Sequence, residues 1–89
     1  MTITEHAYER AKERCGWNHK ALNRMLEKVI AHGKRHSDYA GNMRRWIDKV
    51  YLTHKSASKL LIYGNYVFIF IGDSLITVYN IPRNLIGNL

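Results

Sequence analysis

The pair of residues with the clearest chemical potential is His6 and Arg10, which stand one helical turn apart near the start of the chain. Metal-free cleavage of RNA needs a base for the 2′-hydroxyl proton, an acid for the leaving 5′-oxygen and a cation for the phosphorane charge. Imidazole serves either proton role near neutral pH, and guanidinium binds phosphate through two hydrogen bonds. On composition alone, however, this His-x-x-x-Arg spacing is better explained by a solvated helix face.

The sequence contains few residues that suit metal binding, nucleotide binding or nucleophilic catalysis. The histidines are His6, His19, His32, His36 and His54. None has the H-E-x-x-H spacing, and the chain lacks a Gly-rich phosphate loop, a G-x-S-x-G sequence and a C-x-x-C pair. Cys15 is the only cysteine, which excludes an internal disulfide and a multi-cysteine zinc site and fits a half-buried thiol. Asp48 and Asp73 make no convincing acidic cluster, so we expect neither a metal nor a cofactor.

The charge of the chain predicts a polyanionic partner. The 89 residues contain 14 Lys and Arg against 7 Asp and Glu, which gives a net charge of +7. Arg83 is the only basic residue after Lys59, so the basic residues belong almost entirely to the front of the chain. Such an excess suits nucleic acid, an anionic membrane surface or an acidic protein, although solvated helix faces would also account for it.

The length fits one domain, over residues 1–89. The chain starts without the charged and apolar segments of a signal peptide, and its longest apolar run, 66–71, is far short of the ~18 residues that span a bilayer. We therefore expect no membrane association and a reducing, cytoplasmic environment.

Hydrophobic periodicity predicts helices over about 4–15, 18–32 and 42–52. Asn18 is a suitable N-cap for the second helix, and Gly16 and Gly33 suit the ends of the first two. Ala7 and Ala11 are small residues on the buried stripe of the first helix, so another element must pack closely against it. Residues 34–41 are predicted to form a loop.

The back of the chain changes to period two. Three extended runs, about 58–63, 66–71 and 74–80, are separated by Gly64-Asn65 and Gly72-Asp73, which suit two-residue hairpin turns. The prediction is an α+β fold in which the helices pack on a three-stranded antiparallel meander.

The hairpin register predicts two very different sheet faces. One face is aliphatic and must be core; it carries Leu60, Ile62, Val67, Ile69, Ile71, Ile76 and Val78. The other face is aromatic; it carries Lys59, Leu61, Tyr63, Tyr66, Phe68, Phe70, Leu75, Thr77 and Tyr79. Aromatic side chains on a sheet stack on unpaired RNA bases at ~1–3 kcal/mol each. Two alternatives stay open, an exposed stacking surface and a face covered by a helix, and a partial cover would leave Tyr63, Tyr66, Thr77 and Tyr79 at its rim.

Both ends of the chain resemble a known superfamily. The segment His6-Ala7-Tyr8-Glu9-Arg10-Ala11-Lys12-Glu13-Arg14-Cys15-Gly16 is similar to the H-A-x-x-R-x-x-E-R-x-G start of small phage and toxin-like domains, and Leu75-Ile76-Thr77-Val78-Tyr79 is similar to their final L-I-T-V-Y strand. Those domains look like members of the barnase–EndoU–colicin–RelE superfamily of metal-independent ribonucleases. The resemblance implies N-terminal helices before a curved antiparallel sheet, in agreement with the predicted order of elements.

The resemblance also implies site residues. It points to His6 and Arg10 as catalytic groups supported by Arg14, and to Thr77 and Tyr79 on the last strand as further catalytic groups. The middle of the chain, about Lys34 to Lys55, departs from the short toxin pattern, and three strands are fewer than such sheets usually have. The candidate nucleic-acid contacts are Arg14, Lys20, Arg24, Lys28, Arg44, Arg45, Lys59, Tyr63 and Tyr66.

These observations lead to three hypotheses. The first is an RNA-binding, metal-independent endoribonuclease of phage or toxin type in a bacterial cytoplasm, with RNA rather than DNA as the ligand and an antitoxin as a further partner. The second is a non-catalytic phage-type inhibitor that blocks a host defence complex, such as a CRISPR effector, through its basic surface. The third is a helix-turn-helix regulator, which is disfavoured because the 34–41 connection is longer than a turn of ~3–4 residues.

Overall fold

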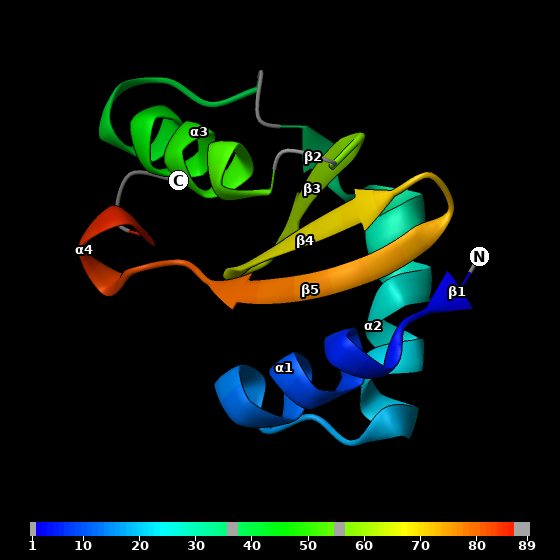
Figure 1. Cartoon of the computed structure of the whole chain (residues 1–89). Helices are drawn as coiled ribbons and strands as arrows, with labels where there is room; N and C mark the ends of the chain where they lie inside the picture. Colours follow the sequence, from blue (N-terminus) through cyan, green and yellow to red (C-terminus); the bar gives the residue numbers. More distant parts are fainter. Residues whose placement is uncertain (1, 36–37, 55–56, 87–89) are drawn as a thin grey trace.

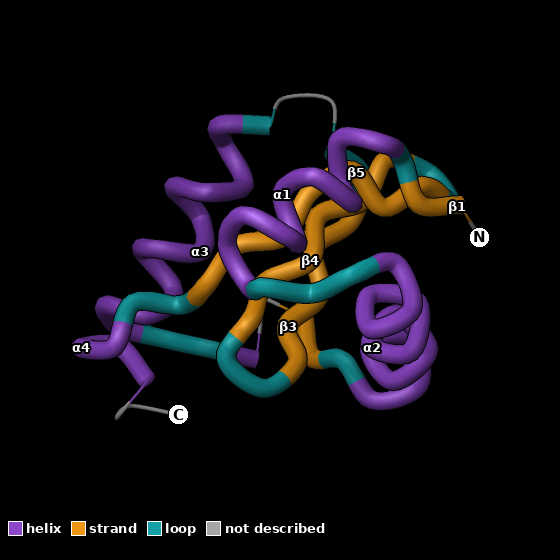
Figure 2. Tube along the Cα trace, turned by 90° about the horizontal axis from the view of Figure 1, so that it is seen from below, coloured by secondary structure: helices purple, strands orange, loops and turns teal. Residues whose placement is uncertain are grey.

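The computed structural model describes residues 2–35, 38–54 and 57–86, which form a sheet with helices on both faces (Figure 1). The helices are α1 (Glu5–Cys15), α2 (His19–His32), α3 (Gly41–Thr53) and α4 (Arg83–Ile86). The strands are β1 (Thr2–Ile3), β2 (Lys34–Arg35), β3 (Lys59–Tyr63), β4 (Tyr66–Ile71) and β5 (Ser74–Asn80). Figure 2 shows α1 lying across the strands, with α2 and α3 on opposite sides of the view.

Local sequence signals explain where the first two helices begin and end. The side-chain oxygens of Thr4 and Asn18 accept hydrogen bonds from the backbone N–H groups of Ala7 at 3.1 Å and Ala21 at 2.8 Å. Gly16 ends α1 with a φ of 72°, in the left-handed region that favours glycine. The three predicted helices are therefore confirmed, whereas the short α4 was not predicted.

The sheet differs from the predicted three-stranded meander, because the described residues form a mixed sheet of five strands in the order β1-β5-β4-β3-β2. The hairpin strands β3, β4 and β5 pair antiparallel, β2 adds antiparallel to β3, and β1 adds parallel to β5. The predicted 34–41 loop therefore contains an edge strand. The two added strands have only two residues each, which is too short for an alternating pattern to be visible in the sequence.

A β-bulge between β4 and β5 corrects the predicted register. Regular pairing after a two-residue turn at Gly72-Asp73 would place Ser74 opposite Ile71 and Ile76 opposite Ile69. The structure has the first of these pairs, but Thr77 lies opposite Ile69. One extra residue in β5 exchanges the faces of the side chains that follow it. Val78 therefore turns to the aromatic face, whereas Thr77 and Tyr79 turn to the aliphatic face.

Both faces of the sheet are covered, so the aromatic face is not an open stacking surface. Helices α1 and α2 cover the aromatic face in a cluster of Ala7, Ala11, Leu22, Leu26, Val29, Leu61, Phe68, Phe70, Leu75 and Val78. Helices α3 and α4 cover the aliphatic face in a cluster of Met43, Ile47, Leu60, Ile62, Val67, Ile69, Ile81 and Leu85. Ile71 was predicted to be core but is 42% exposed, because it ends β4 at the hairpin turn.

Candidate functional site

The residues predicted for chemistry gather where the outer edge of β5 lacks a neighbouring strand. Strand β1 pairs only with Ser74 and Leu75, so the later residues of β5 have no strand on that side within the described ranges. Helix α1 lies beside β5 (Figure 1), and its fully buried Ala7 and Ala11 allow a close approach to the sheet. The flank of α1 that faces the site carries His6, Arg10 and Arg14.

Arg14 joins α1 to the open edge of β5. Its Nη1 donates hydrogen bonds to Thr77 Oγ1 at 3.3 Å and to the Val78 carbonyl at 3.0 Å. Its guanidinium carbon lies 4.2 Å from the centroid of the Tyr79 ring, which is a cation–π contact. Thr77 is only 1% exposed, so its hydroxyl orients the guanidinium and does not lie at an exposed rim.

His54, which was not among the predicted site residues, completes this group from the other side. It is the residue that ends α3, and its Nε2 lies 2.7 Å from the Tyr79 hydroxyl. Partial burial lowers the pKa of His54, and the positive charges of Arg14 and His6 lower this pKa further. His54 is therefore neutral at pH 7 and able to accept a proton. Nothing in its sequence spacing signals this role, because only the fold brings the end of α3 to β5.

The predicted His6–Arg10 pair forms a second group on the exposed part of the same flank. Arg10 Nε donates a hydrogen bond to His6 Nε2 at 3.2 Å, and Arg10 Nη1 makes an ion pair with Glu13 Oε2 at 2.8 Å. The side chain of Arg10 is 35% exposed. An ion pair that is this exposed to water contributes little to stability, so Arg10 can exchange Glu13 for a phosphate.

The predicted basic contacts are distributed over opposite sides of the molecule. Lys20, Arg24 and Lys28 are exposed on α2, which covers the aromatic face of the sheet. Arg44 and Arg45 lie on α3, which covers the aliphatic face, and Arg44 Nε pairs with Asp48 Oδ1 at 3.1 Å. The fold therefore does not bring the predicted basic residues together into one surface.

The three predicted contacts on β3 and β4 are partly covered. Lys59 Nζ lies 5.0 Å from the centroid of the Phe70 ring. Tyr63 and Tyr66 are half-buried against the cluster beneath α1 and α2, and Tyr66 meets Trp17 edge to face at 4.5 Å between ring centroids. Because both rings are half-buried against this cluster, neither is the fully open surface that was predicted for stacking on bases.

Cys15 lies close to Arg14 and the end of β5, but its thiol is not a reactive group. Its Sγ is 3.6 Å from Asn80 Oδ1, and the Asn80 side-chain amide donates to the Arg14 carbonyl. Burial raises the pKa of the Cys15 thiol to about 11, against a smaller opposite effect of Arg14. The thiol therefore stays protonated near neutral pH.

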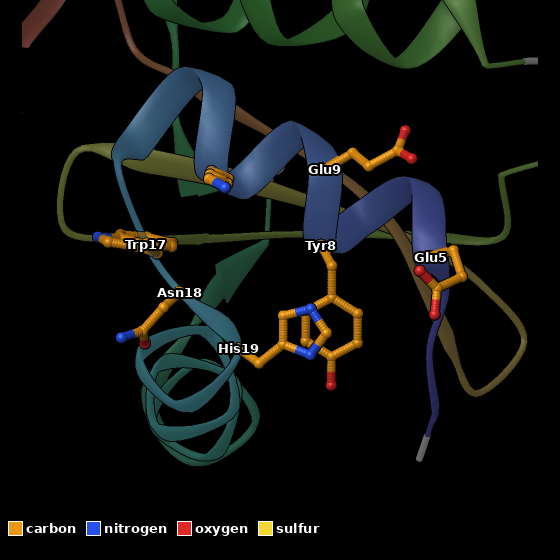
Figure 3. Close-up of a pocket in the computed structure, with 7 residues that line it drawn as sticks. Glu5, Tyr8, Glu9, Trp17, Asn18 and His19 are labelled. Atoms are coloured by element: carbon orange, nitrogen blue, oxygen red, sulfur yellow. The ribbon is translucent and has the colours of Figure 1, made fainter.

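The opposite flank of α1 borders a pocket of about 310 Å³ (Figure 3). The residues that line it are Glu5, Tyr8, Glu9 and Lys12 of α1 and residues 17–19. The Tyr8 and His19 rings stack with centroids 3.8 Å apart and planes inclined by 10°, and Figure 3 shows them overlapping face-on. No local pattern in the sequence indicates this pocket, because it depends on how the turn after Gly16 places residues 17–19 beside α1.

Comparisons with protein-family models, curated proteins and solved structures found no match to this chain. None of the described helices is long and apolar enough to cross a membrane. Within the same residues, no three His, Cys, Asp or Glu side chains are grouped so that they could hold a metal ion. His36 lies outside the described residues.

Proposed function

We propose that the protein binds RNA and cleaves it without a metal ion at the outer edge of β5. The observation that carries this proposal is the hydrogen bond between His54 and Tyr79 beneath the Arg14 guanidinium, with His6 of α1 near enough to interact electrostatically with His54. Two imidazoles, two guanidiniums and a phenol thus come from three separate elements. Such a set contains the base, the acid and the cations that metal-free RNA cleavage needs.

The two arginines have different parts in the proposed reaction. Arg14 is tied to Thr77, Val78 and Tyr79, so it is a fixed positive charge beside the site. Among the described residues, the side-chain partners of Arg10 are His6 and Glu13, both on α1, so its guanidinium can turn to an incoming phosphate and bind it bidentately. When Arg10 moves to the phosphate, Nε2 of His6 becomes available to bind a proton.

In the proposed cleavage, one histidine takes a proton and the other gives one. When the Nε2–H of neutral His54 donates to the Tyr79 hydroxyl, Nδ1 of His54 takes the proton of the 2′-hydroxyl, and the 2′-oxygen forms a bond to phosphorus. The bond between phosphorus and the 5′-oxygen breaks, and protonated His6 gives its proton to that oxygen. The products are a 2′,3′-cyclic phosphate and a 5′-hydroxyl, and Arg10 holds the charge that accumulates on the phosphoryl oxygens.

The proposal is tested by incubating the purified protein with structured and unstructured RNAs in EDTA. We expect the parent to cleave, and His6→Ala and His54→Gln each to lose ~10²–10⁴-fold in rate. His32→Ala is the matched control, because His32 is exposed at the end of α2 and should leave the rate unchanged. Absence of cleavage by the parent, or variants that cleave as fast as the parent, would overturn the proposal.

Growth of bacteria that express the protein provides a second readout. An active endoribonuclease should arrest growth, and His54→Gln should relieve the arrest at equal expression. A protein that binds RNA or a defence complex without cutting would leave growth unchanged in both cases.

A further inference from the structure

The pocket on the far flank of α1 has a chemistry of its own. We propose that it binds an unpaired RNA base that carries an exocyclic amino group, supplied by the strand whose phosphate lies at the β5 edge. This inference rests on the proposed binding of RNA, but it does not depend on cleavage.

The walls of the pocket offer flat rings that are already held in place. Tyr8 and His19 are stacked, and the Tyr8 hydroxyl donates a hydrogen bond to Asn23 Oδ1 at 3.4 Å. Trp17 is fixed against Tyr66 and lies roughly parallel to Phe68, with a 14° angle between the ring planes. Rings of this kind bind single-stranded RNA by stacking on bases, and their preorganisation reduces the entropy lost on binding.

The polar groups of the pocket match the edge of a base better than a phosphate. Glu5 and Glu9 can only accept hydrogen bonds, whereas Lys12 can only donate them. Among the described residues, none of these three side chains has an ion pair or a hydrogen bond that would occupy it. Two unpaired carboxylates repel the RNA backbone but accept well from an amino group, as glutamate does from the N4 amino group of cytosine.

The position of the pocket agrees with one RNA strand that crosses α1. Glu5, Glu9 and Lys12 line one flank of the helix, and His6 and Arg10 occupy the other. The two flanks are separated by about the 10–12 Å diameter of a helix with its side chains. A dinucleotide spans this width, so a phosphate at Arg10 and the base of a neighbouring nucleotide in the pocket can be bound together.

The experiment measures binding, with cleavage blocked by 2′-O-methyl groups. Short oligonucleotides of cytosine or uracil are compared by fluorescence anisotropy, because these two bases have the same size and differ in the amino group at C4. We expect the parent to bind the cytosine oligonucleotide about tenfold more tightly, the effect of one hydrogen bond to a charged group. Equal binding of the two oligonucleotides would overturn the inference.

Charge-matched variants separate base recognition from electrostatics. Removing two carboxylates raises the net charge by two and should strengthen binding of any RNA, as we expect for the control Glu27→Gln/Asp73→Asn, whose two exposed side chains do not line the pocket. The double variant Glu5→Met/Glu9→Met, which removes both acceptors, should instead reduce the preference for cytosine to within about twofold. A double variant that keeps the tenfold preference would contradict the assignment of these carboxylates.

The role of the stacked Tyr8 and His19 rings is tested by His19→Ala. This variant should bind both oligonucleotides about fivefold or more weakly, without a change in the ratio of the two affinities. The outcomes also separate this inference from the proposed function. Preference for cytosine without any RNA cleavage would support the pocket and refute catalysis, whereas cleavage without base preference would do the reverse. A parent that binds neither oligonucleotide would refute both.

Discussion

Replacing Arg14 by methionine should destabilise the fold and also change the titration of the site. Methionine keeps much of the length of the side chain but removes the guanidinium. The change deletes the hydrogen bonds at 3.3 Å to Thr77 and at 3.0 Å to the Val78 carbonyl, as well as the contact with the Tyr79 ring at 4.2 Å. It also removes one of the positive charges that lower the pKa of His54.

The size of the effect follows from what is left behind. The Thr77 hydroxyl is buried, and a buried polar group that loses its partner costs about 1–3 kcal/mol. The lost cation–π contact adds about 0.5–1 kcal/mol, whereas the Val78 carbonyl at the open edge can gain water. Because Arg14 itself is only half-buried, we expect a loss near the lower end, about 2 kcal/mol in the free energy of unfolding.

The assay is denaturant unfolding followed by the fluorescence of Trp17 and Trp46, which pack against the two core clusters. Thr77→Val, alone and combined with Arg14→Met, completes a double-mutant cycle. The double variant should lose about 1 kcal/mol less free energy of unfolding than the sum of the two single variants, because each single change removes the same hydrogen bond. NMR titration should show a higher pKa for His54 in Arg14→Met than in the parent.

Two results would refute this reasoning. A loss below about 0.5 kcal/mol for Arg14→Met would place the residue among ordinary surface positions. Fully additive effects in the cycle, with an unchanged pKa of His54, would show that Arg14 does not connect α1, β5 and the end of α3.

Three further predictions concern single residues. Folding lowers the pKa of His54 below its unfolded value of ~6.5. As the pH falls through that value, the unfolded chain therefore binds more protons than the folded protein does. The free energy of unfolding should then decrease on acidification. His54→Gln should make this dependence shallower in unfolding curves recorded between pH 5 and 8, and an unchanged slope would argue against the lowered pKa. Cys15, with a pKa of about 11, should react with iodoacetamide at pH 7.5 much more slowly in the native protein than in urea, so equal rates would contradict its burial. Gly16→Ala should lower the free energy of unfolding by about 1–2 kcal/mol, because alanine is strained at a φ of 72°. A steric clash does not contribute, since an added Cβ would meet no atom within 4 Å. An unchanged melting temperature would rule out this strain.

The sequence predicts the parts of the fold that have a clear period or a clear signal at their ends. The apolar spacing of Leu22, Leu26 and Val29 identifies α2, and Asn18 marks its start. The added strands β1 and β2 are too short to show a pattern, and they form because the longer hairpin strands offer unpaired edges. The bulge in β5 was also invisible, since alternation along β5 looks the same in either register.

The sequence predicts those parts of the candidate site that lie on one helix, but not the contacts between residues that are far apart in the chain. The spacing of His6 and Arg10 on one helix is local, and the structure places these side chains 3.2 Å apart. His54 belongs to the site through its contact with Tyr79, and no local pattern connects these two residues. The bulge is the reason that Tyr79 meets His54, because it turns Tyr79 toward the face covered by α3.

The central claim, metal-free cleavage of RNA through its own 2′-hydroxyl, is tested most directly with a single substrate pair. An oligoribonucleotide that the protein cleaves in EDTA is compared with the same oligonucleotide carrying one 2′-deoxy residue on the 5′ side of the cleavage site, and the products are identified by mass spectrometry. We predict a 2′,3′-cyclic phosphate and a 5′-hydroxyl from the first and no cleavage at that position in the second. Equal cleavage of both, or no cleavage of any RNA, would contradict the assignment of His6, Arg10 and His54 to this reaction.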